Sequence, residues 1–208
     1  QIAVIAVKKL PGPLDYEISE FDIFKEADPA VSSPFPGRTM ELLSLYLVHD
    51  PLDSMDQVVD LTGKKLNGTF RISVPAGKHA LYGLVKIHGF MEVINGAPGA
   101  TGPVLNHYDQ EAVRKYLKNM SDNIENKTGP LSEHIRALFT DSMELEGANW
   151  SAEIIDEFRK RRGYDIFPYL PFILFKTGAM GNITDLKYGA AMSPQVENMV
   201  RRMRYDFE

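Results

Sequence analysis

The sequence predicts an α/β fold in which a parallel sheet is flanked by helices and carries an inserted antiparallel β subdomain. Residues 2–7, IAVIAV, form a continuous apolar run, which is typical of a strand buried on both faces. Several short strand-like segments, separated by turn residues, fill residues 38–87. From residue 109 onward, helical and strand patterns alternate, which is the order expected of βα units in a parallel sheet.

The composition is that of a globular protein with a sizeable core. The chain has 208 residues, of which 44% are hydrophobic and 25% are charged. It contains no cysteine, which excludes disulfides, thiolate catalysis and cysteine metal ligands. A net charge of −5 without a basic face argues against nucleic acid as a partner. No apolar run reaches the roughly 18 residues that a membrane span needs.

The β-rich part of the chain begins after a stretch with little periodicity. Residues 11–37 contain five prolines, so we expect irregular structure there. The Asn67-Gly68 pair predicts a hairpin turn, and Ala76-Gly77 predicts a second turn. The strands expected on either side of these turns are residues 41–48, 57–62, 68–75 and 79–87.

The second half contains a long Gly- and Pro-rich loop, residues 88–106, followed by recognisable helix signals. Asp109 and Ser151 are predicted helix caps, and Gly163 is a predicted helix end after the basic run 159–162. Ser193-Pro194 opens a last helix. Residues 165–174 carry two prolines, so no regular helix is expected there.

The segment 135–146 is the candidate catalytic strand, because it begins apolar and ends in acids. Alternation along a strand places Glu144 and Glu146 on one side, about 6.6 Å apart. In a parallel barrel that side points inward, and the carboxyl ends of the strands carry the catalytic groups. The two glutamates therefore form a candidate carboxylate pair for cleaving a glycosidic bond. The alternative is that both lie in a solvated loop.

Four neighbours and one distant residue complete the candidate site. Asp141, Ser142, Asn149 and Trp150 are candidates for binding substrate, because amides bridge hydroxyls and tryptophan faces stack on sugar rings. Trp150 can equally serve as a hydrophobic staple that packs beside the following helix. His107 follows the Gly-rich loop and is a further candidate, although a solvated loop histidine is the simpler interpretation.

The blocks GPVLNHYDQEAVRKYL and IRALFTDSMELEGANWSAEIIDEFRKRRGYDIFPYLP, from residue 102 to residue 171, resemble glycoside hydrolase family 106, the α-L-rhamnosidase family. The segment VVDLTGKKLNGTFRISVPAGKHALYGLVKI is similar to the inserted β segment of those enzymes. The resemblance implies a partial (β/α) TIM-type barrel, formed here by residues 1–10 and 88–208, with residues 38–87 inserted.

The resemblance also implies an activity. Members cleave α-L-rhamnosides of plant-type polysaccharides with inversion, and glutamates serve as acid and base. Glu144 falls on the glutamate of the matching motif, whereas Glu146 has no fixed counterpart. Calcium is an implied cofactor whose ligands stay unknown. Bacterial export to the periplasm or the medium is also implied.

Both ends of the sequence lie inside patterns, so we expect this chain to be a piece of a longer protein. It opens on Gln1 within a strand pattern and closes on Glu208 within a helical one. The expected partners are then the remaining polypeptide, a carbohydrate substrate, and a second copy at the cut barrel edge. Two alternatives remain open, namely a carbohydrate-binding or degenerate module without catalysis, and an assembly domain without a ligand.

Overall fold

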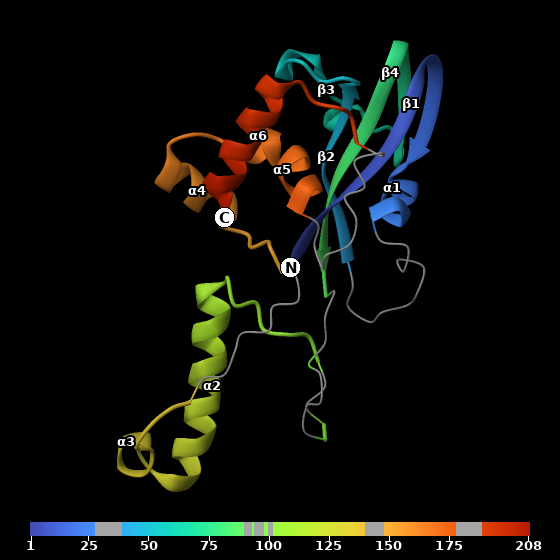
Figure 1. Cartoon of the computed structure of the whole chain (residues 1–208). Helices are drawn as coiled ribbons and strands as arrows, with labels where there is room; N and C mark the ends of the chain where they lie inside the picture. Colours follow the sequence, from blue (N-terminus) through green and yellow to red (C-terminus); the bar gives the residue numbers. More distant parts are fainter. Residues whose placement is uncertain (28–38, 90–92, 94–97, 100–101, 140–147, 178–188) are drawn as a thin grey trace.

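A computed structural model gives the fold of the chain. It describes residues 1–27, 39–89, 93, 98–99, 102–139, 148–177 and 189–208 (Figure 1). Within these residues a four-stranded sheet is packed between helices, and a separate long helix, α2, lies beyond one end of the sheet (Figure 1). The mixed helix and strand content agrees with the predicted α/β class.

The sheet is antiparallel, with the strand order β1-β4-β2-β3. Its strands are β1 (Ile2–Ser19), β2 (Thr39–His49), β3 (Val58–Asp60) and β4 (Thr69–His88). The apolar run at residues 2–7 is a strand, as predicted, but its predicted parallel pairing is wrong. Ile2 pairs with Ile87 and Ser19 with Thr69, so β1 runs antiparallel along nearly all of β4.

Residues 11–19 belong to β1 and residues 20–27 form helix α1 (Glu20–Ala27), which corrects the prediction of irregular structure there. Prolines are tolerated in β1 because it is an edge strand and needs ladder hydrogen bonds on one side only. The register shifts between Gly12 and Leu14, where the strand bends. A Cβ at Gly12 would lie 1.8 Å from the Pro75 carbonyl oxygen, so only glycine fits this crossing.

The β-rich segment is confirmed in part. Asn67 (φ 51°) and Gly68 (φ 78°) form the predicted tight turn, which a bridge between Leu66 and Thr69 closes. The predicted turn at Ala76-Gly77 is wrong, since β4 continues through it as one 20-residue strand. Short 3₁₀ turns at Met55–Gln57 and Thr62–Lys64 flank β3.

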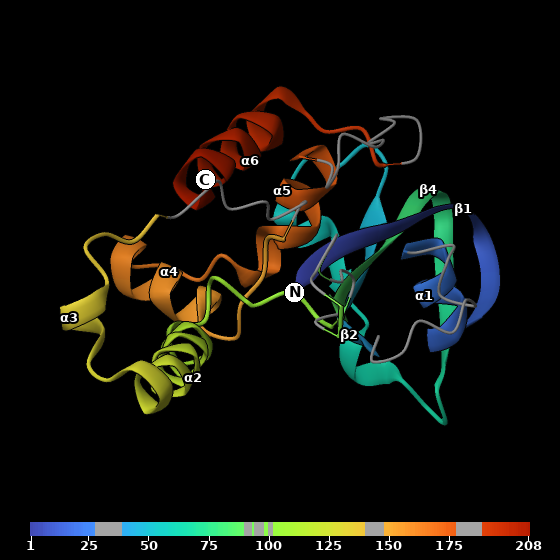
Figure 2. The same ribbon diagram turned by 90° about the horizontal axis from the view of Figure 1, so that it is seen from below.

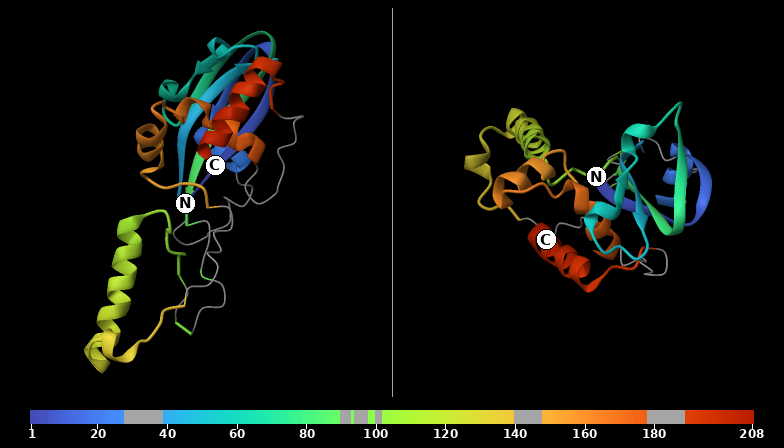
Figure 3. Two further views of the ribbon diagram at one scale, coloured as in Figure 1. Left: turned by 60° about the vertical axis from the view of Figure 1, so that its left-hand side comes forward. Right: turned by 90° about the horizontal axis from the view of Figure 1, so that it is seen from above.

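Helices cover both faces of the sheet, as Figures 2 and 3 show. Helices α4 (Ile154–Arg162), α5 (Leu170–Thr177) and α6 (Pro194–Phe207) lie over one face and α1 over the other. The central strands therefore carry apolar side chains on both faces. Tyr82 and Leu84 of β4 belong to one core cluster, and Leu81 and Val85 belong to the cluster on the other face.

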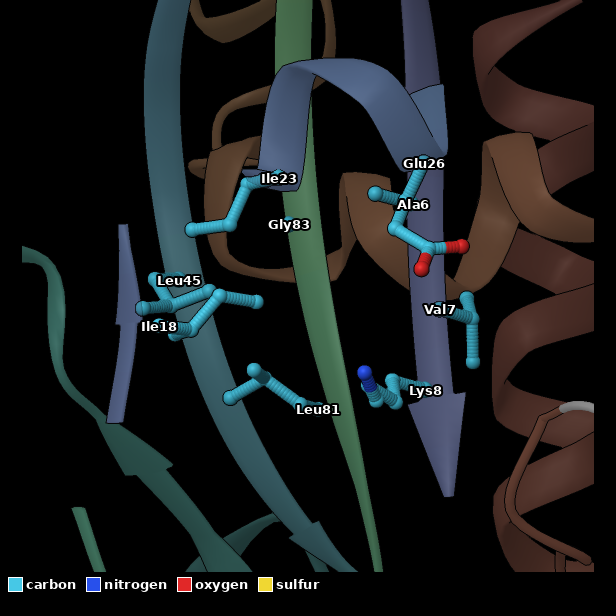
Figure 4. Close-up of a pocket in the computed structure, with 9 residues that line it drawn as sticks. All are labelled: Ala6, Val7, Lys8, Ile18, Ile23, Glu26, Leu45, Leu81 and Gly83. Carbon is cyan, nitrogen blue, oxygen red and sulfur yellow. The ribbon is translucent and has the colours of Figure 1, made fainter. Parts of the chain in front are cut away.

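Helix α1 approaches the sheet closely at Gly83. A Cβ there would lie 2.7 Å from Cγ2 of Ile23, so glycine allows the helix to settle onto β4. The apolar cavity beside this contact, lined by Ala6, Ile23 and Leu45 among others, measures only about 10 Å³ (Figure 4). It is at the lower limit for one water molecule and has no room for a larger ligand.

Most of the predicted helix signals are confirmed. Asp109 caps α2 (Gln110–Thr128), which ends at Gly129 before the short helix α3 (Leu131–His134). Gly163 ends α4 in the left-handed conformation, and the Ser193 side chain caps α6. The predicted cap at Ser151 is wrong, because α4 begins at Ile154 and Ser151 is buried.

Residues 167–174 are helical, which corrects the prediction that the segment 165–174 holds no regular helix. A 3₁₀ turn at Phe167–Tyr169 leads directly into α5. The prolines are compatible with this because Pro168 and Pro171 fall in first turns, where the missing N–H has no intrahelical acceptor.

The predicted strand 135–146 is not present over its described part. Residues 135–139 have no strand, and the side chains of Leu138 and Phe139 are 82% and 88% exposed. Residues 140–147 lie outside the described residues. The named strands pair only antiparallel and form one sheet with covering helices, so the described ranges show no (β/α) barrel.

Helix α2 projects away from the sheet (Figures 1 and 3). It carries an apolar stripe that is not buried: Tyr116 is 55% and Leu117 51% exposed. None of the helices in the described residues is both long and apolar enough to cross a membrane.

Candidate functional site

The chain that follows the predicted catalytic strand is anchored at the beginning of β1. The Asn149 side chain accepts a hydrogen bond from the Ala3 N–H at 2.6 Å and donates one to the Ala3 carbonyl at 3.0 Å. The backbone N–H groups of Asn149 and Trp150 both donate to the Gln1 carbonyl at 3.3 Å. Asn149 thus satisfies the outward-facing backbone groups of an edge strand, which otherwise have no partner in the sheet.

The loop that precedes α2 reaches the same place. The Tyr108 hydroxyl donates to the Ala148 carbonyl at 3.3 Å, so the end of this loop contacts residue 148. The neighbouring His107 is partly buried, and among the described residues its buried Nδ1 has no hydrogen-bond partner. The start of β1, this loop and residues 148–150 therefore converge where the chain leaves the segment 140–147.

Trp150 belongs to the hydrophobic core. It is 5% exposed and lies in the cluster beneath α4, α5 and α6, together with Phe158 and Tyr82. Partly buried Ile155 packs against the same cluster. This position supports the packing interpretation of Trp150 rather than sugar stacking, because its ring face is not available to a ligand.

The predicted acids and their neighbour lie outside the described residues. Asp141, Ser142, Glu144 and Glu146 all fall within 140–147, so their catalytic and substrate-binding roles stay predictions. Of the predicted site residues, the structure brings Asn149 and His107 into one region and buries Trp150 nearby.

The implied calcium ion finds no ligand set in the described part of the chain. Calcium needs six to eight oxygen ligands, usually with several carboxylates. In the described ranges, no three histidine, aspartate or glutamate side chains come close enough together to hold a metal. The side chains of the described ranges therefore do not fit a calcium ion.

A hollow that the sequence did not predict lies between α6 and the segment 164–169. Its volume is about 560 Å³. The Tyr164 hydroxyl donates to Asp206 at 3.0 Å, and burial together with this carboxylate raises the pKa of Tyr164 to about 12. The lining residues are Tyr164, Tyr169, Gln195, Asn198, Met199, Arg202, Met203 and Asp206. The polar residues that recur every three or four positions along α6 could have indicated the helix face that lines the hollow. The two tyrosines come from another segment, and only the tertiary structure brings them to this face.

The chain is similar to known rhamnosidases. The model of the family described as alpha-L-rhamnosidase, glycoside hydrolase family 106, matches residues 43–183. The solved structure of the rhamnosidase from Novosphingobium sp. PP1Y is 29% identical over 76% of this chain, with a TM-score of 0.51. The match covers 14% of that chain, so this chain spans a small part of the length of that enzyme. No curated protein matches.

The family model covers more than half of the sequence and includes the motif residues on which the resemblance was based. The similar solved structure is itself a rhamnosidase. The chain therefore belongs to glycoside hydrolase family 106, the α-L-rhamnosidase family.

Proposed function

We propose that this chain is part of a glycosidase that cleaves α-L-rhamnosides of plant-type polysaccharides by a two-carboxylate, inverting mechanism. The observation that supports the proposal is the family match over residues 43–183, which includes Glu144. The similarity to a solved rhamnosidase supports the same enzyme class.

Glu144 is the proposed general acid. It would protonate the leaving oxygen while a second carboxylate activates water on the opposite face of the sugar. In an inverting enzyme the two carboxyl groups lie about 6.5–9.5 Å apart, and two residues of extended chain from Glu144 to Glu146 span about 6.6 Å. Glu146 is thus one candidate for the base, and a carboxylate from further polypeptide is the other.

The barrel implied by the family belongs to this proposal as well. In a complete enzyme, further strands would surround residues 140–147 and would cover the exposed side chains of Leu138 and Phe139. Export to the periplasm or the medium, where plant polysaccharides are met, is proposed with it.

The experiment is Glu144→Gln in the intact protein, assayed on an aryl α-L-rhamnoside. Glutamine keeps the shape but cannot donate the proton, so we expect kcat to fall by about 10²–10⁴-fold. Glu133→Gln on exposed α3 is the control and keeps wild-type kcat. NMR of the first-formed sugar should show the inverted anomer. Activity of Glu144→Gln within a few fold of wild type would remove Glu144 from the mechanism.

The second candidate function is carbohydrate binding without catalysis, which the hollow beside α6 favours. Saccharide binding by the intact protein, without turnover of any aryl rhamnoside, would establish it.

A further inference from the structure

We propose that His49 and His79 form a binding site for one divalent transition-metal ion, such as Zn²⁺, that links strands β2 and β4. The inference depends on the register of the two strands, on the ring nitrogens of the two histidines and on the bare backbone beside them. It does not require the proposed hydrolase activity.

The register of the sheet brings the two imidazoles together. His49 ends β2 and lies directly opposite His79 of β4 in the antiparallel ladder. Directly opposite residues project from the same face of a sheet, with their Cβ atoms about 4.5–5.5 Å apart. The ring centroids are 5.3 Å apart, and the ring planes are almost perpendicular, at 89°. The two side chains therefore meet without any change in the strands.

The distance between the rings fits a shared ion. A histidine nitrogen lies about 2.0–2.1 Å from a bound zinc ion, which puts the ring centroid about 3.2 Å from the ion. Two imidazoles at a tetrahedral angle then have their centroids about 5.2 Å apart. The observed separation of 5.3 Å agrees with this value, so rotation of the rings would bring one nitrogen of each to the same ion.

A hydrogen bond leaves one nitrogen of His49 free to bind a metal. Its Nδ1 lies 2.8 Å from the Pro51 carbonyl oxygen, which can only accept, so Nδ1 carries the proton and Nε2 carries the lone pair. Metal-binding histidines usually donate their other N–H to a carbonyl or carboxylate in this way, which orients the ring. Nε2 borders the space over Gly77, because a Cβ there would lie 3.8 Å from it.

His79 supplies the second nitrogen. The residue is only 6% exposed, and among the described residues its buried Nδ1 has no hydrogen-bond partner. A buried polar atom without a partner costs free energy, which an ion bound at Nδ1 would offset. The adjacent ring atom Cε1 would lie 3.9 Å from a Cβ at Gly77, the same point that Nε2 of His49 borders. The missing side chain at Gly77 therefore leaves space where both rings meet.

The ligand atoms of the site select a transition metal. Imidazole nitrogens suit Zn²⁺, Cu²⁺ and Ni²⁺, whereas Ca²⁺ and Mg²⁺ prefer oxygen ligands. The neighbouring carboxylate of Asp50 is already engaged at both oxygens, by Lys9 and by the Ala191 N–H. Water molecules would therefore complete the coordination, and the ion would bind more weakly than one held by four side chains.

The test is isothermal titration of the 208-residue chain, without a polyhistidine tag, with ZnCl₂. We expect one Zn²⁺ per chain, and an excess of CaCl₂ should not compete. The melting temperature should rise by about 5–10 °C once free Zn²⁺ exceeds Kd by about a hundredfold. His134→Gln on exposed α3 is the control and should bind Zn²⁺ like wild type.

Two variants test the ligands separately. His49→Gln and His79→Gln should each weaken Zn²⁺ binding by at least about tenfold and abolish the rise in melting temperature. His49 is only half-buried, so His49→Gln decides the result if circular dichroism shows that His79→Gln is unfolded. The EPR spectrum of the Cu²⁺-loaded chain should show two bound nitrogens, and one in His49→Gln. Equal Zn²⁺ affinity of His49→Gln and His134→Gln, no saturable Zn²⁺ binding, or displacement of Zn²⁺ by CaCl₂ would each overturn the proposal.

Discussion

At the scale of single residues, one amide connects the candidate site to the sheet. The Asn149 side chain accepts a hydrogen bond from the Ala3 N–H and donates one to the Ala3 carbonyl. It thus makes the pair of hydrogen bonds that a neighbouring strand would make at this edge of β1. It attaches residues 148–150 to the beginning of β1, and its predicted contact with substrate stays a prediction. An amide is required here because the Ala3 N–H and carbonyl need an acceptor and a donor side by side.

We expect Asn149→Asp to lower the free energy of unfolding by about 1–3 kcal/mol, because a carboxylate oxygen would then face the Ala3 carbonyl without a proton between them. Urea denaturation at neutral pH measures the change. Asn126→Asp on exposed α2 is the matched control and should stay within about 0.5 kcal/mol of wild type. Equal losses in the two variants would mean that the Asn149 bridge does not contribute to stability.

At the scale of elements, the link into α6 is attached to the sheet by a compact set of polar contacts. Lys9 of β1 donates to Asp50 at 2.6 Å, and Asp50 accepts from the Ala191 N–H at 2.8 Å. The buried Tyr82 hydroxyl accepts from the Ala190 N–H at 2.7 Å, and burial raises the pKa of Tyr82 to about 12. These contacts determine where α6, and with it the hollow, lies against the sheet.

This attachment predicts an acid-sensitive step. Burial acts to raise the pKa of Asp50, but the hydrogen bonds from Lys9 and Ala191 outweigh it and hold the pKa below its usual value of 3.8. The unfolded chain therefore takes up a proton first, and the stabilisation from Asp50 is present above pH 3.8 and lost as pH falls further.

Asp50→Asn should accordingly be less stable than wild type at pH 6, and the gap should narrow as pH falls below 4. Thermal denaturation across this pH range measures it, with the exposed Asp53→Asn as control. A gap that stays constant with pH would show that the charge of Asp50 does not stabilise the fold.

At the scale of the whole molecule, the described residues contain a well-packed unit, formed by the sheet and its covering helices, and an exposed helix, α2. The sheet is covered on both faces, whereas α2 keeps its apolar stripe uncovered (Figure 1). Helices derive most of their stability from packing of the apolar face, so α2 should open far more readily than α6, whose Val196 and Val200 are buried.

Native-state hydrogen exchange tests this contrast. Amides of α2 should exchange at rates close to those of an isolated peptide helix, while those of β4 from His79 to Ile87 should exchange only through global unfolding. Helix α6 is the internal control, because it is also an amphipathic helix but its apolar face is packed on the core. Protection of α2 equal to that of β4 would show that its apolar stripe is covered in solution.

The sequence by itself determined what depends on near neighbours. The caps at Asp109 and Ser193, the helix end at Gly163 and the turn at Asn67-Gly68 are all present, because each is set by one or two side chains acting on adjacent backbone. Family membership also followed from residues at fixed spacing.

Only the tertiary structure decided how distant segments pair. Ile2 lies opposite Ile87 in an antiparallel ladder, although its apolar run equally fits a parallel strand, because burial on both faces produces the same sequence pattern in either direction. Trp150 is buried, and Tyr169 and Arg202 line one hollow, because segments far apart in the sequence pack together in the core beneath α4, α5 and α6. Local sequence fixes which residues are apolar or polar, but the face that each one meets is set by elements far along the chain.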